Sequence, residues 1–283
     1  MDTTLTAYGL KYNPFLPSLA PEAYVWSPAA DHFVWRVERL ARDGGFALVT
    51  GEPGAGKSSV MRRVQARLAA TPDLRIGELT RPQSSLADLY RELGFLFDVA
   101  LSPHNRWAGT KVLRERWQAH IDSALFRPVL LVDEAQEMRP TVLNELRLLA
   151  SARFDSHILL TVVLAGDARL VDKLATPELA PMGSRIRARL ALDPLAPAEL
   201  RDRLSHLLAA AGNPALMTTG LVDTLCERAG GNLRTLAHLG AELLDAGMAQ
   251  DAARLDEKLF LEIFATPDTA GAARAAKANR RPR

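Results

Sequence analysis

The sequence predicts an α/β fold, a parallel β-sheet flanked by helices and followed by a small all-helical domain. Up to about residue 194, short apolar runs typical of buried strands alternate with amphipathic helical stretches. Such alternation indicates a parallel sheet that is covered by helices on both faces. Beyond Pro194 only helical stretches follow. We therefore expect an α/β domain over residues 28–194 and a helical lid domain over residues 195–264.

Each element is predicted from its local pattern. The run Val129-Leu130-Leu131-Val132 is the clearest strand, because it leads directly into two acidic residues. In residues 28–42, Phe33, Val34, Val37 and Leu40 lie on one side of a helix. Residues 1–27 show no clear element. Strands are expected at 46–50, 74–79, 128–132, 157–165 and 186–192, and further helices at 57–70, 84–97, 107–125, 140–152, 168–174, 197–211, 219–228, 233–246 and 253–264.

Composition excludes several classes of protein. The 283 residues are 48% hydrophobic and 24% charged, which excludes a disordered chain and a membrane bundle. No apolar run approaches the roughly 20 residues that span a bilayer, and the N-terminus lacks the pattern of a secretory signal. The single cysteine, Cys226, excludes an internal disulfide framework and a multi-cysteine zinc site. We expect a soluble, cytoplasmic protein that does not bind membranes.

The last residues, 265–283, form a basic segment. They contain five basic residues and one acidic residue, Asp268, in a small, alanine-rich sequence without an apolar stripe. We expect a disordered tail. Two roles stay open for it, a solvated run of charge or an arm that contacts the phosphates of DNA.

Residues 51–58 carry the most specific motif. They read Gly-Glu-Pro-Gly-Ala-Gly-Lys-Ser and match G-x-x-x-x-G-K-[ST] at every fixed position, after a predicted strand and before a predicted helix. The glycines allow backbone N–H groups to surround phosphate oxygens, and Lys57 supplies a charge for the β- and γ-phosphates. The expected nucleotide-binding residues are Gly51, Glu52, Pro53, Gly54, Ala55, Gly56, Lys57, Ser58 and Ser59.

An acidic pair follows the clearest strand. Asp133, at the end of that strand, is expected to hold Mg²⁺ together with the hydroxyl of Ser58. Glu134 is placed to polarise the water that attacks the γ-phosphate. The adjacent pair favours ATP hydrolysis over phosphoryl transfer to a metabolite.

Two arginine-containing segments complete a family resemblance. Ser184-Arg185-Ile186 precedes the last predicted strand, and Gly230-Gly231-Asn232-Leu233-Arg234 opens a helix of the predicted lid. With residues 51–58 and the acidic pair, they resemble the AAA+ ATPase superfamily. Residues 8–15, Asp133-Glu134-Ala135-Gln136 and Leu164-Ala165-Gly166-Asp167 further resemble the group of ExeA-type secretion ATPases and transposon-encoded target-selection ATPases of the TniB, TnsC and IstB kind. The resemblance covers residues 6–264.

This resemblance implies further roles. Asp167 corresponds to a polar sensor after the fourth strand, although the secretion ATPases usually carry glutamine there. Arg185 matches the arginine finger that acts on ATP in a neighbouring subunit, with Arg187 and Arg189 as competing candidates. Arg234 matches the second sensor. The residues expected near the adenine are Tyr12, Pro14 and Phe15.

The predicted function is that of an ATP- and Mg²⁺-dependent ATP hydrolase that regulates DNA transposition. By this resemblance, homo-oligomers, as rings or filaments, would assemble on duplex DNA with ATP, recruit or activate a transposase, and disassemble on hydrolysis. An ExeA-like role in secretion or pilus assembly is the first alternative. The chain ends after the predicted lid, where secretion relatives normally continue, and this favours transposition. A nucleotide-dependent signalling switch is the second alternative.

Overall fold

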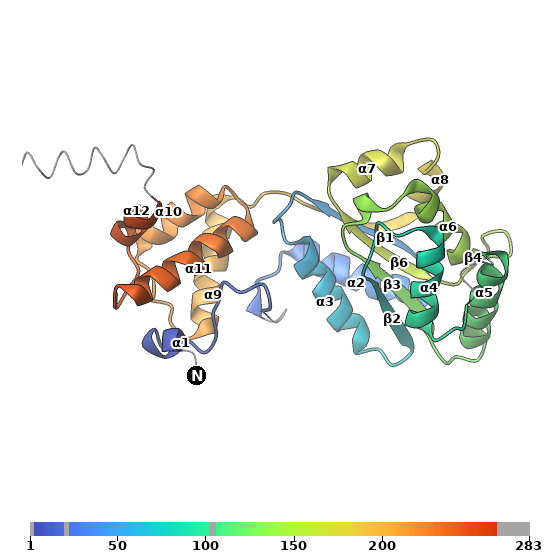
Figure 1. Cartoon of the computed structure of the whole chain (residues 1–283), viewed down its shortest axis with the longest axis horizontal. Helices are drawn as coiled ribbons and strands as arrows, with labels where there is room; N and C mark the ends of the chain where they lie inside the picture. Colours follow the sequence, from blue (N-terminus) through green and yellow to red (C-terminus); the bar gives the residue numbers. More distant parts are fainter. Residues whose placement is uncertain (1–2, 20–22, 102–105, 265–283) are drawn as a thin grey trace, which may run out of the picture. The chain divides into compact units, whose positions relative to one another are not determined.

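The computed structural model describes residues 3–19, 23–101 and 106–264 (Figure 1). The chain divides into two compact units. Residues Trp26–Asp193 form the first, here called the α/β unit. The described residues of Met1–Val25 and Pro194–Arg283 form the second, the helical unit. The basic segment 265–283 lies outside the described residues.

A five-stranded parallel sheet forms the centre of the α/β unit, as the sequence predicts. Its strand order is β2-β3-β6-β1-β7, and every neighbouring pair is parallel. All the carboxyl ends of the strands therefore lie at one edge of the sheet, here called the carboxyl edge, and the amino ends lie at the opposite, amino edge. The strands are β1 (Gly45–Gly51), β2 (Leu74–Leu79), β3 (Arg127–Val132), β6 (Thr161–Gly166) and β7 (Ile186–Leu192).

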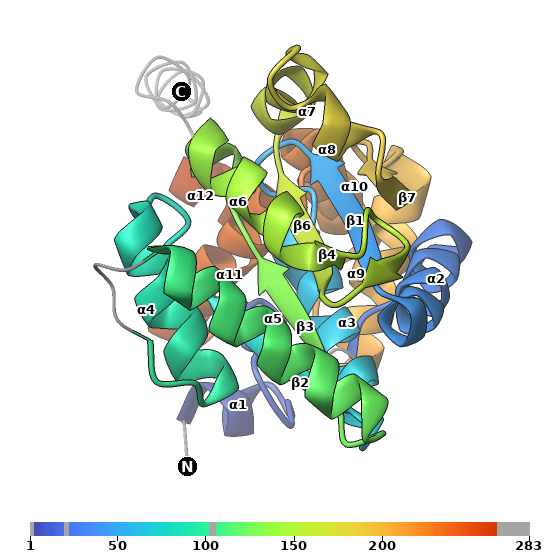
Figure 2. The ribbon, with the colours of Figure 1, turned by 90° about the vertical axis from the view of Figure 1, so that its right-hand side faces the viewer.

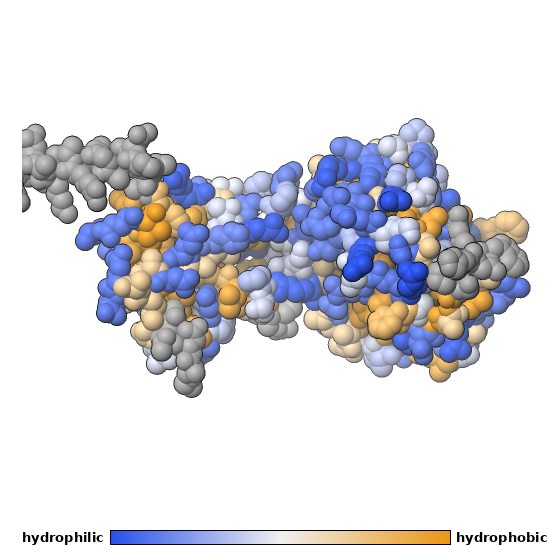
Figure 3. All heavy atoms as spheres, viewed as in Figure 1, coloured by the Kyte–Doolittle hydropathy of each residue, from blue (hydrophilic) through white to orange (hydrophobic). Residues whose placement is uncertain are grey.

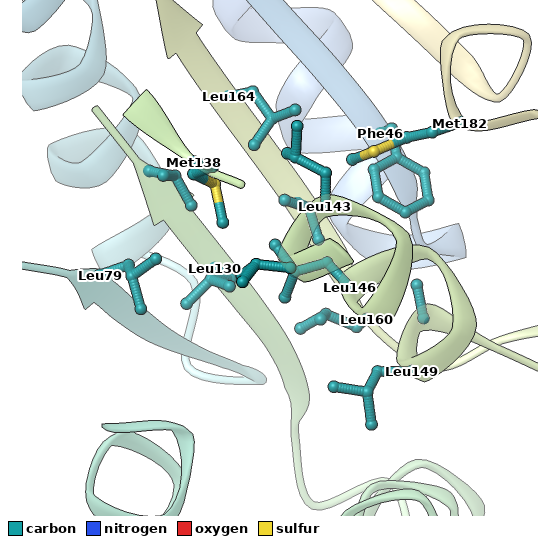
Figure 4. Packing of buried hydrophobic residues seen from close by; sticks show 14 of the residues in the cluster. Phe46, Leu79, Leu130, Met138, Leu143, Leu146, Leu149, Leu160, Leu164 and Met182 are labelled. Carbon is teal, nitrogen blue, oxygen red and sulfur yellow. The ribbon is translucent and has the colours of Figure 1, made fainter. Parts of the chain in front are cut away.

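Helices cover both faces of this sheet (Figure 2). On one face, Leu130 and Leu164 pack against α4, α5 and α6, with α7 and α8 at the border of the same cluster; Figure 4 shows part of this packing. On the other face, Val129 and Leu131 pack with α2 and α3. Successive residues of one strand thus point to opposite faces of the sheet, and both faces are apolar. The helices are α2 (Pro28–Asp43), α3 (Lys57–Ala69), α4 (Leu86–Phe97), α5 (Arg106–Asp122), α6 (Pro140–Ala150), α7 (Ala168–Ala175) and α8 (Ala180–Gly183).

The sequence prediction is wrong in the region before β6. It places one strand over residues 157–165 and extends the preceding helix to residue 152. Instead, α6 ends at Ala150, and two short strands, β4 (Ser151–Ala152) and β5 (His157–Ile158), form an antiparallel pair. The turn between them holds Arg153, Phe154 and Asp155 in the left-handed region. Arginine and phenylalanine rarely adopt that conformation, so the sequence gives little indication of the turn.

The helical unit has its own apolar core. It contains α1 (Thr3–Ala7), which the sequence did not predict, and α9 (Pro197–Ala211), α10 (Thr219–Ala229), α11 (Leu233–Ala249) and α12 (Glu257–Phe264). Tyr8 and Phe15 are buried in this core. A side chain at Gly240 of α11 would collide with the Phe15 ring, and one at Gly247 would collide with the Tyr8 hydroxyl. The N-terminal segment therefore packs along one face of α11.

The surface mixes hydrophilic and hydrophobic areas (Figure 3). Among the described residues, no helix combines the length and apolar character needed to cross a membrane. The most exposed of the large apolar side chains of the α/β unit are those of Phe154, Phe95 and Leu125.

Candidate nucleotide-binding and hydrolysis site

The glycine-rich loop connects β1 to α3 at the carboxyl edge. Gly54 and Gly56 have φ values of +89° and +100°, conformations that L side chains rarely adopt. Gly56 is also the N-cap of α3 and supplies no side-chain acceptor for the first turn. The N–H groups at this helix start therefore favour an anion, as the motif predicts.

Lys57 is held inside the loop. Its side chain is 6% exposed, and Nζ donates to the carbonyl oxygens of Gly51 at 2.9 Å and Glu52 at 3.2 Å. These two carbonyls direct the ammonium group across the loop. The arrangement suits a lysine that contacts phosphate oxygens.

The hydroxyl of Ser58 joins this loop to the acidic pair. Its Oγ donates to Asp133 Oδ2 at 2.7 Å, although the two residues are 75 positions apart. Asp133 follows β3, and Ser58 lies in the first turn of α3. A hydroxyl and a carboxylate are oxygen ligands of the kind that Mg²⁺ prefers. The two residues predicted to hold the metal thus lie together and fit it chemically.

Glu134 has an unusual backbone conformation. Its φ and ψ are 51° and 38°, in the left-handed region, and its N–H donates to Asp133 Oδ1 at 2.9 Å. The carboxylate is exposed at the carboxyl edge and accepts a hydrogen bond from Gln136 Nε2 through Oε2. A non-glycine residue rarely adopts this conformation, and such outliers cluster at active sites.

Asp167 follows β6 at the same edge and caps α7. Its Oδ1 accepts from the Arg169 N–H, and its Oδ2 accepts from Arg169 Nε, both at 2.9 Å. Hydrogen bonding from Arg169 lowers the pKa of Asp167, and the charge of Lys57 acts in the same direction. The carboxylate is therefore ionised and already engaged by Arg169, and its predicted sensor role stays a prediction.

Arg185 lies at the amino edge of the sheet. It directly precedes β7, whose first residue, Ile186, pairs with Phe46 near the start of β1. The glycine-rich loop begins at the other end of β1, at Gly51. The five-residue step from Phe46 to Gly51 spans about 16 Å in an extended strand. Arg185 is therefore separated from the loop of its own chain by the length of the sheet.

The Arg185 guanidinium has partners at the amino edge. Nη2 contacts Asp155 Oδ2 in an ion pair, and Nη1 donates to the Pro181 carbonyl. Arg185 lines a cavity of about 300 Å³ together with Arg147, Arg187 and Asp155. Hydrogen bonds from Ser151 and Arg185 lower the pKa of Asp155, so its carboxylate is ionised. Motif spacing could not predict Asp155, because it reaches this cavity from the unpredicted β4–β5 turn, and Arg147 reaches it from α6 without belonging to any motif.

The competing arginines have different surroundings. Both Arg187 and Arg189 are exposed on the edge strand β7. The carbonyl oxygen of Arg187 accepts from Arg36 of α2, and Arg189 Nη2 donates to the Gly183 carbonyl at 2.8 Å. Arg187 and Arg189 thus lie on β7, and Arg185 lies directly before it.

The remaining predicted site residues belong to the helical unit. Arg234 is exposed in the first turn of α11, where its N–H donates to the N-cap Asn232 at 3.0 Å. Pro14 and Phe15 are buried, and Tyr12 is half-buried against the same core. Their predicted roles, as the second sensor and the adenine contacts, stay predictions.

Gln136 is the residue whose importance the sequence did not indicate. It was recognised only as part of the Asp133-Glu134-Ala135-Gln136 motif. Its side chain connects Glu134 with the backbone N–H of Asp167, 31 residues away. Sequence spacing could not predict this contact, because it depends on β3 and β6 being neighbours.

Comparisons with known proteins agree with this geometry. Residues 40–174 match the family model of the AAA domain. The chain is 31% identical over 253 residues to general secretion pathway protein A of Aeromonas hydrophila. That match covers 88% of this chain and 45% of the relative, so the chain spans less than half of the relative's length.

Solved structures share the fold at low sequence identity. Cdc6p from Pyrobaculum aerophilum has a TM-score of 0.68 at 16% identity, with 86% of this chain and 67% of that chain covered. Drosophila ORC bound to DNA has a TM-score of 0.66 at 16% identity, with coverages of 99% and 69%. The Thermotoga maritima RuvB branch migration motor has a TM-score of 0.55 at 17% identity, with coverages of 88% and 72%. Residues 40–174 are thus similar to an AAA domain, and the chain has the AAA+ P-loop NTPase fold.

Proposed function

We propose that this protein hydrolyses ATP in assemblies on duplex DNA and thereby regulates DNA transposition. The observation that carries the ATPase part is the 2.7 Å contact between Ser58 Oγ and Asp133 Oδ2, which joins the two halves of the nucleotide motif. Within the motif, Lys57 binds the β- and γ-phosphates, and Ser58 and Asp133 hold Mg²⁺. Bound Mg²⁺ would neutralise phosphate charge during hydrolysis.

Glu134 is the general base in this proposal. Its carboxylate accepts a proton from the attacking water, the water oxygen bonds to the γ-phosphorus, and the bond to the β–γ bridging oxygen breaks. The products are ADP and inorganic phosphate. We expect Glu134→Gln to keep ATP binding and to lower kcat about 100-fold or more. Wild-type turnover in this variant would contradict the assignment.

Arg185 acts on a neighbouring copy in this proposal. Its place at the amino edge, about 16 Å along β1 from its own glycine-rich loop, argues against action within one chain. An arginine finger supplied in trans stabilises the charge of the transition state. Each active site then requires two copies of the chain, and this requirement supports a homo-oligomer.

The transposition part is supported by sequence. Residues 8–15, 133–136 and 164–167 resemble the transposon-encoded target-selection ATPases. In addition, one protein with the same fold is described as bound to DNA and another as a Holliday junction branch migration motor. The partners in this proposal are duplex DNA and a transposase.

A role in secretion is the second candidate, and one observation favours it. The match to general secretion pathway protein A reaches 31% identity, well above the identities to the DNA-associated structures. The match covers 45% of that relative. In a secretion role, the similarity therefore supports only the ATPase activity of the shared portion.

Electron microscopy distinguishes these candidates. The wild-type chain is imaged with a slowly hydrolysed ATP analogue, with and without duplex DNA, and Lys57→Ala is the control. We expect ordered assemblies that require both nucleotide and DNA and that Lys57→Ala does not form. Assemblies that are indifferent to DNA would contradict the transposition proposal and favour the secretion role. A chain that stays monomeric under all conditions would favour the nucleotide switch.

A further inference from the structure

A buried amide lies between the acidic pair and the end of β6. The Gln136 side chain belongs to the 3₁₀ turn Ala135–Glu137, and the residue is 5% exposed. Its Nε2 donates to Glu134 Oε2, and its Oε1 accepts from the Asp167 N–H at 3.3 Å. Both ends of the amide are therefore used, and they connect two neighbouring strands at the carboxyl edge.

The surroundings hold this amide in place. A Cβ at Gly166 would lie 2.7 Å from Gln136 Oε1, so only glycine leaves room for the side chain there. From α7, Lys173 Nζ donates to the carbonyl oxygens of Gln136 and, at 2.8 Å, Met138. Ala135 and Met138, on either side of Gln136, are fully buried. The turn that carries the amide is thus fixed from both sides.

The carboxylate of Glu134 needs such support. Its backbone is in the left-handed region, where a non-glycine residue persists only if its surroundings hold it. The residue is exposed, so burial does not fix the direction of the carboxylate. The Gln136 amide supplies a directional contact at Oε2 and leaves Oε1 to accept a proton.

We infer that Gln136 is a positioning residue that aims the Glu134 carboxylate for hydrolysis and ties it to the end of β6. This inference rests on the proposed role of Glu134 as general base. A carboxylate that turns freely would spend less time in the reactive geometry, and small misplacements of this kind reduce rates strongly. Because Gln136 also holds the Asp167 N–H, a shift at the end of β6 would reach Glu134 directly.

Replacement of Gln136 by methionine tests this role. Methionine has a similar length and volume but makes no comparable hydrogen bond. We expect Gln136→Met in the full chain to lower kcat about tenfold or more and to leave the KM for ATP nearly unchanged. The matched control is Gln118→Met, which removes an amide bonded to Asp122 Oδ1 at 2.7 Å near the end of α5, the helix that leads into the amino edge of the sheet at β3. The control should hydrolyse ATP at the wild-type rate.

A second variant, Gln136→Glu, separates positioning from packing. Near neutral pH it places a second carboxylate beside Glu134, and the two repel each other. The change keeps the length and volume of the side chain but replaces the donor at Glu134 Oε2 with a second acceptor. We expect Gln136→Glu to lower kcat at least as much as Gln136→Met.

Comparisons among four variants decide the outcome. The expected pattern is an inactive Glu134→Gln variant, a kcat defect in Gln136→Met, and no further single-turnover loss when the two changes are combined. If Glu134→Gln is inactive but Gln136→Met keeps wild-type kcat, the positioning role is overturned and the proposed function stands. If Glu134→Gln itself hydrolyses ATP normally, both are overturned. A Gln136→Glu variant that keeps the wild-type kcat would reduce Gln136 to a packing role.

Discussion

Lys57 is a buried charge whose partners in the chain are two backbone carbonyls. Its replacement by alanine removes the charge that faces the phosphates while leaving those carbonyls close to solvent. We expect Lys57→Ala to weaken ATP binding about 100-fold or more, about 3 kcal/mol, and to leave folding intact. Equilibrium binding of a fluorescent ATP analogue measures the loss. Lys111→Ala, on the exposed side of α5 beside Glu115, is the control, and equal binding by both variants would contradict the prediction.

Asp167 gives the folded state a dependence on pH. Its pKa is lowered from the ordinary value of 3.8 by Arg169, so its stabilisation is present above that value and is lost as the pH falls through the lower, folded-state pKa. As the N-cap of α7, it contributes about 1 kcal/mol. Asp167→Ala should therefore lower the free energy of unfolding by about 1 kcal/mol at neutral pH. This difference between wild type and variant should become smaller below about pH 4. Urea denaturation of both proteins across this pH range measures the difference. A difference that becomes larger on acidification would contradict the assignment.

At the residue scale, the sequence was sufficient to locate the parts of the site that consist of residues adjacent in the chain. The glycine-rich loop and the Asp133-Glu134 pair are local motifs, so their positions could be predicted without a structure. The roles of Asp155 and Gln136 could not be predicted, because the groups that they contact, on Arg185 and Asp167, are distant in sequence.

At the scale of elements, the sequence predicted every strand of the large sheet except the boundaries around β6. A continuous apolar run suggested one long strand from residue 157. The chain instead turns through three left-handed residues, and the Leu159 N–H donates to the Ala150 carbonyl at 2.7 Å. Periodicity reports burial, and Leu159 and Leu160, which lie between β5 and β6, are as buried as β6 itself. It could not show where the hydrogen bonding changes partners.

A buried hydrogen bond ties α4 to α6. The Tyr90 hydroxyl donates to Glu145 Oε1 at 2.5 Å, and Glu145 is 3% exposed. Tyr90→Phe removes a donor from a buried carboxylate, so we expect the free energy of unfolding to fall by about 1–3 kcal/mol. Chemical denaturation measures it, with Tyr12→Phe in the helical unit as the control for loss of a hydroxyl. A change below that of the control would mean that the contact adds nothing to stability.

At the scale of the whole molecule, the alternation of strands and helices followed by helices alone was sufficient to predict the fold class. It could not show that the N-terminal segment belongs with the helical unit. Lys11 N–H donates to the Ala211 carbonyl at 2.7 Å, and Asn213 Nδ2 donates to the Tyr8 carbonyl at 2.8 Å. These contacts join residues about 200 positions apart, beyond the reach of any local pattern.

The central claim is that one copy of the chain completes the hydrolytic site of another through Arg185. Mixing two inactive variants at fixed total protein tests it most directly. Arg185→Ala keeps an intact nucleotide site, and Lys57→Ala keeps an intact Arg185. The matched control mixes Lys57→Ala with Glu134→Gln, because Glu134 lies beside Asp133 and Ser58 of its own chain. Arg187→Ala and Arg189→Ala, mixed in the same way, identify which arginine is responsible.

We expect Arg185→Ala and Lys57→Ala each to have little ATPase activity alone and to regain activity when mixed, with a maximum near equal amounts. The control mixture should stay inactive, since none of its chains has both a working nucleotide site and its own Glu134. Wild-type turnover should also rise more than linearly with protein concentration. No recovery at any mixing ratio, together with wild-type turnover strictly proportional to protein concentration, would contradict a site shared between copies.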